Sequence, residues 1–155
     1  MQPVQLPIGL QLSQAARGIG RAFDEALAGA GGSLPVWLVL LSMKTRQITS
    51  QRELAAAVGI REATLTHHLN GMEYAGLITR RRDPANRRIH IVEPTPDGEA
   101  LFLRLRDTAM SFDGRLRAGI AEPDLAALRD VLARLAANVG ASPSDGPPWA
   151  GLTDG

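Results

Sequence analysis

Residues 50–75 read SQRELAAAVGIREATLTHHLNGMEYA, and this stretch decides the fold. A helix-turn-helix needs two helices that cross steeply through a tight turn. Ala55 supplies the small residue that a close crossing requires, and Gly59 supplies the residue that tolerates positive φ in the turn. Ser50 and Glu53 form a capping-box pattern that starts the first helix. The apolar residues that would lock the crossing angle from beneath are Leu54, Val58, Ile60 and Leu65.

The second helix of this motif is expected over residues 62–75, with Gly76 in the usual position of a C-terminal glycine. Leu65, Leu69 and Met72 make its inner stripe. Its outer face is polar and carries side chains that can reach base edges and phosphates. The residues predicted to contact DNA from this helix are Arg61, Thr64, Thr66, His67 and Asn70. The alternative reading is a helix corner in some other α-helical protein.

A basic hairpin directly downstream argues against that alternative. Residues 77–82 and 88–92 are rich in β-branched side chains, and residues 83–86 between them have turn chemistry. Such a hairpin suits a minor groove or its flanking phosphates. The residues predicted to contact DNA from this wing are Arg80, Arg81, Arg82, Arg87, Arg88 and His90. From residue 44 to 90 there are nine Lys/Arg against four Asp/Glu, whereas residues 93–155 have six against ten.

The remaining segments are helical in pattern. Residues 10–30 carry one broad apolar face, and residues 36–43 are apolar on nearly every side, as in a helix buried all round. Thr95 and Pro96 open a long helix that ends near residue 119. A last helix from Glu122 has an apolar stripe, and the Pro/Gly/Ser-rich tail 140–155 is expected to be mobile. The stripe consists of Leu125, Leu128, Val131, Leu132, Leu135 and Val139.

On these motifs the chain resembles the MarR (multiple-antibiotic-resistance regulator) family from about residue 10 to 139. Five short patterns carry the resemblance together, although none would do so alone. They are Ser50-x-x-Glu-Leu-Ala55, Thr64-Leu-Thr66, Met72-Glu-x-x-Gly-Leu-Ile-x-Arg80, Asp83-Pro-x-Asn-Arg-Arg88 and Thr95-Pro-x-Gly98. The expected fold is mainly α (α+β), a winged helix-turn-helix with N- and C-terminal dimerisation helices.

The resemblance implies a single MarR-like domain over residues 1–155. Within it, residues 34–94 would bind DNA, and residues 8–32 and 95–139 would form a helical dimerisation part. It implies a homodimer on a pseudo-palindromic operator, acting as a repressor. Two residues depart from the family pattern: Asn86 stands where an aspartate usually braces the wing arginines, and Arg61 stands where a serine-like cap usually starts the recognition helix.

The resemblance also implies release from DNA by a phenolic or other aromatic ligand. In this interpretation Trp37 stacks on an aromatic acid, and Arg17 or Arg21 pairs with its carboxylate. The residues expected to line the pocket are Arg17, Arg21, Phe23, Trp37, Met43, His68, Met110 and Phe112. The alternative for most of them is ordinary core packing. A regulator that needs no ligand and a winged-helix module that binds protein remain the alternative functions.

Composition excludes several kinds of site and several classes of protein. The chain has no cysteine, which excludes disulfides, thiolate zinc sites and thiol redox switches. Adjacent His67 and His68 diverge by about 100° on a helix and make a poor metal site. No catalytic constellation or phosphate loop is evident, so we expect neither an enzyme nor a cofactor. No apolar run reaches about 18 residues and no signal sequence is recognisable, so we expect a cytoplasmic protein without a membrane partner.

Overall fold

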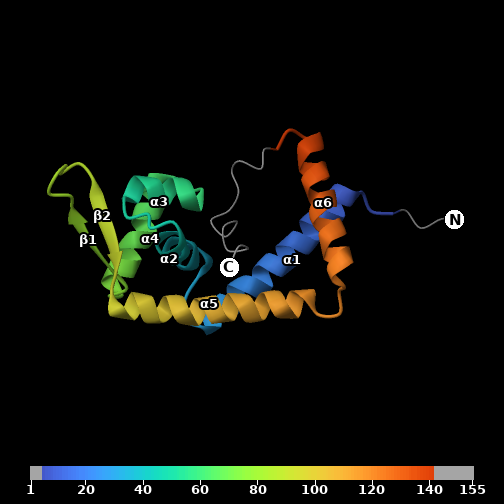
Figure 1. Cartoon of the computed structure of the whole chain (residues 1–155), viewed down its shortest axis with the longest axis horizontal. Helices are drawn as coiled ribbons and strands as arrows, with labels where there is room; N and C mark the ends of the chain where they lie inside the picture. The colour runs from blue at the N-terminus through green and yellow to red at the C-terminus, as the bar shows by residue number, and fades with distance from the viewer. Residues whose placement is uncertain (1–4, 142–155) are drawn as a thin grey trace.

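The computed structural model describes residues 5–141, with a compact head at one end of a long helix and the last helix following its other end (Figure 1). The first helix runs from beside the last helix to the middle of the long one. The expected mobile tail lies almost wholly outside the described residues. The elements in order are α1 (Ile8–Gly29), α2 (Leu34–Thr45), α3 (Gln51–Val58), α4 (Glu62–Tyr74), β1 (Ile78–Arg82), β2 (His90–Pro94), α5 (Pro96–Arg117) and α6 (Glu122–Asn138). This mainly helical winged fold confirms the predicted fold class.

Hydroxyl caps start three of these helices, and those at Ser50 and Thr95 confirm the sequence prediction. Ser33 Oγ accepts from the Val36 N–H at 3.4 Å, Ser50 Oγ from the Glu53 N–H at 3.2 Å, and Thr95 Oγ1 from the Gly98 N–H at 3.1 Å. Each cap satisfies a backbone donor that has no partner inside the helix. Only the serine half of the capping box at Ser50 forms, since the hydrogen bonds of residues 5–141 include none that the Glu53 side chain accepts.

β1 and β2 form an antiparallel hairpin, with Ile78 paired to Pro94 and Arg82 paired to His90. The second strand begins two residues later than predicted, because side chains at the tip bind the backbone instead. Asp83 Oδ1 accepts from the Ala85 N–H at 2.8 Å, and Asn86 Oδ1 accepts from the Arg88 N–H at 3.2 Å. These Asx-type bonds compete with strand pairing and define the loop.

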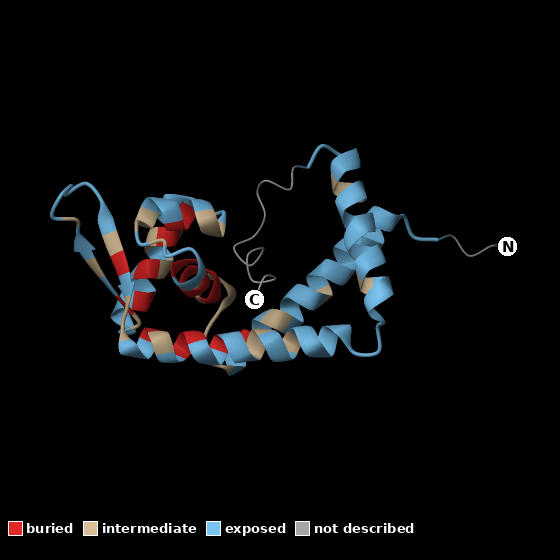
Figure 2. Ribbon diagram, in the orientation of Figure 1, coloured by how far each residue is buried: buried red, intermediate tan, exposed pale blue. Residues whose placement is uncertain are grey.

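The core lies in the head and in the adjoining half of α5 (Figure 2). α2 is buried from Trp37 to Met43, as its uniformly apolar sequence predicts. Leu101 and Leu105 of α5 are fully buried beside Leu27 of α1, so the long helix joins the head to the N-terminal arm. No residue of α6 is buried.

The hairpin leaves the head at a tight junction with α5. The Thr95 N–H donates to the Leu77 carbonyl at 2.9 Å, and its hydroxyl donates to the Gly76 carbonyl at 2.6 Å. A Cβ at residue 98 would collide with the Leu77 carbonyl oxygen, so glycine is required there. The wing is therefore held directly against the start of α5.

In the described part of the chain, no single helix is long and apolar enough to span a membrane. Taken together, α1 and α2 pass the same length and composition test, but only across a 77° bend.

Candidate nucleic-acid interface

The helix-turn-helix forms from α3, the Gly59 turn and α4. Gly59 has φ 77° and ends α3 in the left-handed conformation that a glycine adopts without strain. Leu54, Ala55 and Leu65 are buried between the two helices. Of the four residues predicted to lock the crossing, Leu54 and Leu65 are buried, and Val58 and Ile60 pack half-buried against the same core.

The outward face of α4 carries three of the predicted residues. Thr64, His67 and Asn70 are exposed. Arg61 precedes the helix without a side-chain cap, in agreement with the loss of the usual serine. Tyr74, at the end of the helix, is 97% exposed, although the sequence interpretation assigned it no role.

Thr66 does not belong to this outward face. It is half-buried, and its hydroxyl accepts from Gln51 Nε2 at 2.7 Å while donating to the Glu62 carbonyl at 2.9 Å. These bonds tie the start of α3 to α4, so the hydroxyl is already engaged. Residue 66 lies next to the inner stripe of Leu65 and Leu69, and that adjacency was the signal that could have placed it.

Arg80 is tied to the recognition helix, whereas the sequence placed it among the free wing cations. Its guanidinium donates to both carboxylate oxygens of Glu73, each at 3.2 Å, and to Asn70 Oδ1 at 2.5 Å. The hydrogen bond from Arg80 lowers the pKa of the Glu73 carboxyl below its usual 4.5 against the opposing effect of desolvation, and the positive charge of Arg80 lowers it further. This side-chain group, residues 70, 73 and 80, is called the wing clamp below.

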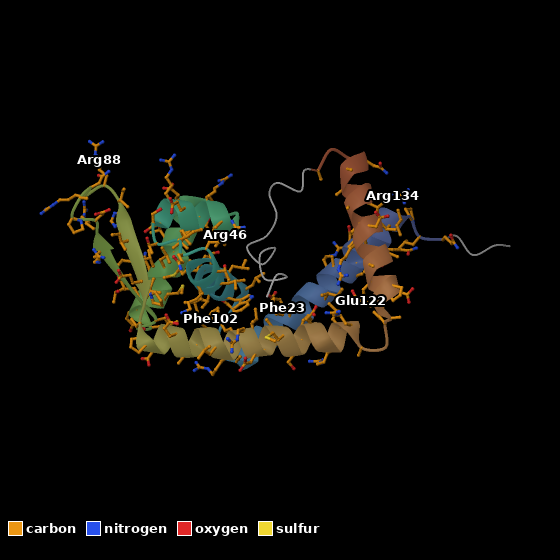
Figure 3. All side chains as sticks on the ribbon, in the orientation of Figure 1. Phe23, Arg46, Arg88, Phe102, Glu122 and Arg134 are labelled. Atoms are coloured by element: carbon orange, nitrogen blue, oxygen red, sulfur yellow. The ribbon has the colours of Figure 1, made fainter. Side chains whose placement is uncertain are left out.

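The other wing arginines divide into two kinds. Arg81 pairs with Glu93 at 3.1 Å across the hairpin, and Arg82 donates to the Arg87 carbonyl at 3.2 Å. The ion pairs found within residues 5–141 include none for Arg87 or Arg88, which flank the tip. Arg88 points away from the hairpin into solvent (Figure 3). On the wing, these two side chains have neither an ion pair nor a hydrogen bond among the described residues, so both guanidinium groups can meet a polyanion.

Further positive charge lies on the head outside the predicted set. Arg46 at the end of α2 and Arg52 on α3 are exposed, and the ion pairs of the described residues include neither of them. Their charge was visible in the basic excess of residues 44–90, but no motif singled them out. His90 is exposed at the start of β2, opposite Arg82.

The eight residues expected to line a ligand pocket do not come together. Trp37 is 4% exposed and stacks on Phe102, with ring centroids 5.6 Å apart. Met43 is also in the core, so neither side chain is available to a ligand in this conformation. Met110 is exposed, and His68 lies half-buried on α4 beside His67.

The other members of that set lie along α1 and α5. Phe23 and Phe112 pack with ring centroids 5.0 Å apart. An open hollow of about 320 Å³ lies beside Phe112, and a second of about 330 Å³ lies beside Arg17 and Arg21. The first hollow is lined by Ala26, Asp107, Thr108, Ser111, Phe112 and Arg115. The sequence prediction missed its polar residues because it took only aromatic side chains, methionines and the α1 arginines as the pocket lining.

Known proteins share both the sequence motif and the fold. The family model described as MarR family matches residues 33–90. The HTH-type transcriptional regulator YdgJ of Bacillus subtilis is 32% identical over 90 residues, which cover 58% of this chain and 55% of YdgJ. The match therefore spans about half the length of that relative.

Two solved structures extend the similarity over most of the chain. The transcriptional regulator PA3341 is 33% identical with a TM-score of 0.69, over 86% of this chain and 98% of its own. CouR of Rhodococcus jostii RHA1, solved with p-coumaroyl-CoA, is 26% identical with a TM-score of 0.69, over 88% of this chain and 96% of its own. CouR has also been solved as a transcriptional repressor bound to a 23-mer DNA duplex, with a TM-score of 0.72 over 84% of this chain and 92% of its own. With the helix-turn-helix, the wing and their order along the chain, these similarities show that the chain belongs to the MarR family of transcriptional regulators.

Proposed function

We propose that this chain is a sequence-specific repressor that binds double-stranded DNA as a homodimer and is released by a small organic ligand. One observation carries the proposal: a helix with a polar, exposed outer face is rigidly presented beside a hairpin whose two tip arginines have no ion-pair partner in the described residues. Membership of a family of regulators agrees with the expectation that the chain is not an enzyme.

In this proposal α4 enters the major groove, where a helix fits and each base pair shows a distinct pattern of donors and acceptors. His67, Asn70 and Thr64 supply side chains of suitable chemistry on its outer face. Arg87 and Arg88 contact phosphates or the adjacent minor groove, which fixes the register but carries no sequence information. CouR, 26% identical, has been solved on a DNA duplex and supports this arrangement.

The homodimer is proposed from apolar surface that one copy leaves uncovered. α6 buries none of its residues, and Leu128 on its apolar stripe is 52% exposed. Each leucine that is fully buried contributes about 2 kcal/mol, so several together would hold two copies at working concentrations. Large apolar side chains exposed on α1 and α6 are Ile8, Leu10, Leu12, Ile19, Leu128, Val131 and Leu132, and Val139 directly follows α6.

A two-fold dimer would present two α4 helices related by symmetry. Its operator would then be pseudo-palindromic, with half-sites about one helical turn apart. Residues 34–94 would form the DNA-binding part, and residues 8–32 and 95–139 the dimerisation part. The protein would act in the cytoplasm, where its DNA is.

The ligand would occupy the hollow between α1 and α5. Phe112 offers an aromatic wall, Arg115 offers a guanidinium for a carboxylate, and Ser111 offers a hydroxyl. α5 joins the head to the dimerisation helices, so a molecule wedged there would bind one spacing of the two heads better than another. A tenfold loss of DNA affinity requires the ligand's binding free energies for the two spacings to differ by about 1.4 kcal/mol. CouR, solved with p-coumaroyl-CoA, supports an acidic aromatic ligand.

A gel shift on genomic fragments at 50 and 200 mM salt, with excess non-specific competitor, tests the proposal. A few fragments should shift at both salt concentrations, and salicylate-like acids should release them. A protein-binding winged helix would shift no fragment above the competitor background. A ligand-independent regulator would shift fragments but respond to no organic acid.

A further inference from the structure

The outer face of α4 carries two residues that the packing of the fold does not use, Gly71 and Tyr74. At about 100° per residue around the helix axis, Gly71 lies about 40° and Tyr74 about 20° from His67. Leu65 and Leu69, which are fully buried, lie about 160° from His67 on the opposite side. Gly71 and Tyr74 therefore share the face that the proposed function assigns to DNA.

Nothing in the packing of this chain requires glycine at residue 71. Gly71 lies inside α4, is exposed, and is not among the glycines with positive φ. A Cβ built at this position would meet no neighbouring atom of the described residues within 4 Å. Glycine destabilises a helix interior relative to alanine, so helix stability is lost here without a gain in packing. Such a glycine indicates that something outside the chain approaches the helix closely.

Tyr74 is the last residue of α4 and the only tyrosine in the chain. It is 97% exposed, so the fold covers almost none of it. Helical side chains lean toward the N-terminus of their helix, and the surface beside Tyr74 is therefore that of the turn containing Gly71. A phenol hydroxyl donates a hydrogen bond, and tyrosine is among the residues that contact DNA phosphates.

The position and charge of this end of α4 suit a phosphate. Helix-turn-helix proteins contact base edges with the N-terminal residues of the recognition helix. Tyr74 follows Thr64 by about 15 Å along the axis, whereas the major groove is about 12 Å wide, so this end lies toward the backbone that borders the groove. Within the wing clamp, Glu73 accepts two hydrogen bonds from Arg80, which offsets a negative charge that would repel a phosphate.

We infer that Gly71 and Tyr74 form a contact for the DNA backbone. Gly71 lets the sugar–phosphate chain come close to α4, and the Tyr74 hydroxyl donates to a phosphate oxygen at the edge of the major groove. The inference rests on the proposed function and adds an uncharged contact to the charged ones at Arg87 and Arg88. Because no cation is involved, this contact contributes affinity without salt dependence or base choice.

Tyr74→Phe, which removes only the hydroxyl, tests the hydrogen bond. Its affinity for the operator selected by the wild type should fall by about tenfold, because a hydrogen bond to a charged group is lost in each protomer. The slope of affinity against salt concentration and the selected sequence should both stay unchanged. If Tyr74→Phe binds as tightly as the wild type while Tyr74→Ala changes base preference, the ring contacts a base and the inference is wrong.

Gly71→Ala and Gly71→Leu test the close approach, because stability and binding should change in opposite directions. The melting temperature of the free protein should rise by about 3 °C in Gly71→Ala, since alanine and leucine favour a helix more than glycine does. The affinity for DNA should fall in Gly71→Ala and fall further in Gly71→Leu, as the added side chain meets the backbone of the duplex. Undiminished binding by Gly71→Leu would overturn the inference.

Nitration of the wild type by tetranitromethane gives a readout without any substitution. Because Tyr74 is the only tyrosine, the absorbance of nitrotyrosine reports on this residue alone. The selected duplex should slow the reaction, and salt that dissociates the complex should restore its rate. A rate that the bound duplex leaves unchanged would place Tyr74 outside the interface and overturn the inference alone. Failure of the wild type to bind any duplex above non-specific competitor would overturn the proposed function, and the inference with it.

Discussion

Replacing Arg87 and Arg88 together with alanine should flatten the salt dependence of DNA binding. Of the five wing arginines, Arg80 is held by Glu73, Arg81 pairs with Glu93, and Arg82 donates to a backbone carbonyl at the tip. The two tip residues are the wing arginines whose side chains have neither an ion pair nor a hydrogen bond among the described residues. We therefore expect these two to carry most of the phosphate contacts of the wing.

The size of the effect follows from counterion release. Each phosphate neutralised contributes about 0.9 to the slope of log K against log salt concentration. Two arginines in each of two protomers would contact four phosphates, so the double variant should lose about 3.6 from that slope. Between 50 and 200 mM salt, the ratio of wild-type to variant affinity should therefore fall by roughly 150-fold.

Fluorescence anisotropy with a labelled operator, titrated at five salt concentrations, measures this slope. Arg134→Ala is the matched control, because it removes one positive charge from α6, far from the wing tip (Figure 3). Its slope should equal that of the wild type. A double variant whose slope is also unchanged would remove the wing tip from the interface and refute the reasoning.

Four further results are expected. Gly98→Ala should lower the melting temperature by roughly 5–10 °C, since the collision with Leu77 breaks about two hydrogen bonds, whereas Gly114→Ala on the same helix meets no atom within 4 Å and should not. Leu128→Glu should convert the dimer to monomers in sedimentation, and a variant that stays dimeric would exclude α6 from the interface. Glu73→Gln should have a lower melting temperature than the wild type at pH 7. The difference should vanish as the pH falls through the lowered pKa of Glu73, because only the ionised carboxylate stabilises the fold. A difference in melting temperature that persists at pH 3 would contradict this. Arg115→Ala should abolish release by salicylate-like acids without weakening DNA binding, and unaltered release would place the ligand elsewhere.

Features that depend on local spacing were predictable from the sequence. Ser50 and Thr95 cap their helices and Gly59 forms the turn, as predicted, because a cap or a left-handed turn involves only residues within one helical turn. The crossing of α3 and α4 followed for the same reason, since Ala55 and Leu65 lie close together in the chain.

Features that depend on pairing between elements were not predictable. Charge alone could not separate Arg80 from Arg88, because the difference is a carboxylate on another element that the fold brings within 3.2 Å. Trp37 looked like a ligand-stacking residue until the fold placed Phe102, 65 residues away, against its ring. Asn86 stands where an aspartate usually braces the wing arginines, and the fold shows that its amide oxygen accepts from the Arg88 N–H at the tip instead.

The stoichiometry of the complex with a selected operator tests the central claim most directly. Sedimentation of the protein with a duplex enriched from a random library should give two chains per duplex, on an inverted repeat whose half-sites lie about 10 base pairs apart. A complex of one chain on a single half-site, or a library from which no sequence is enriched at 150 mM salt, would contradict the account of a dimeric, sequence-specific regulator.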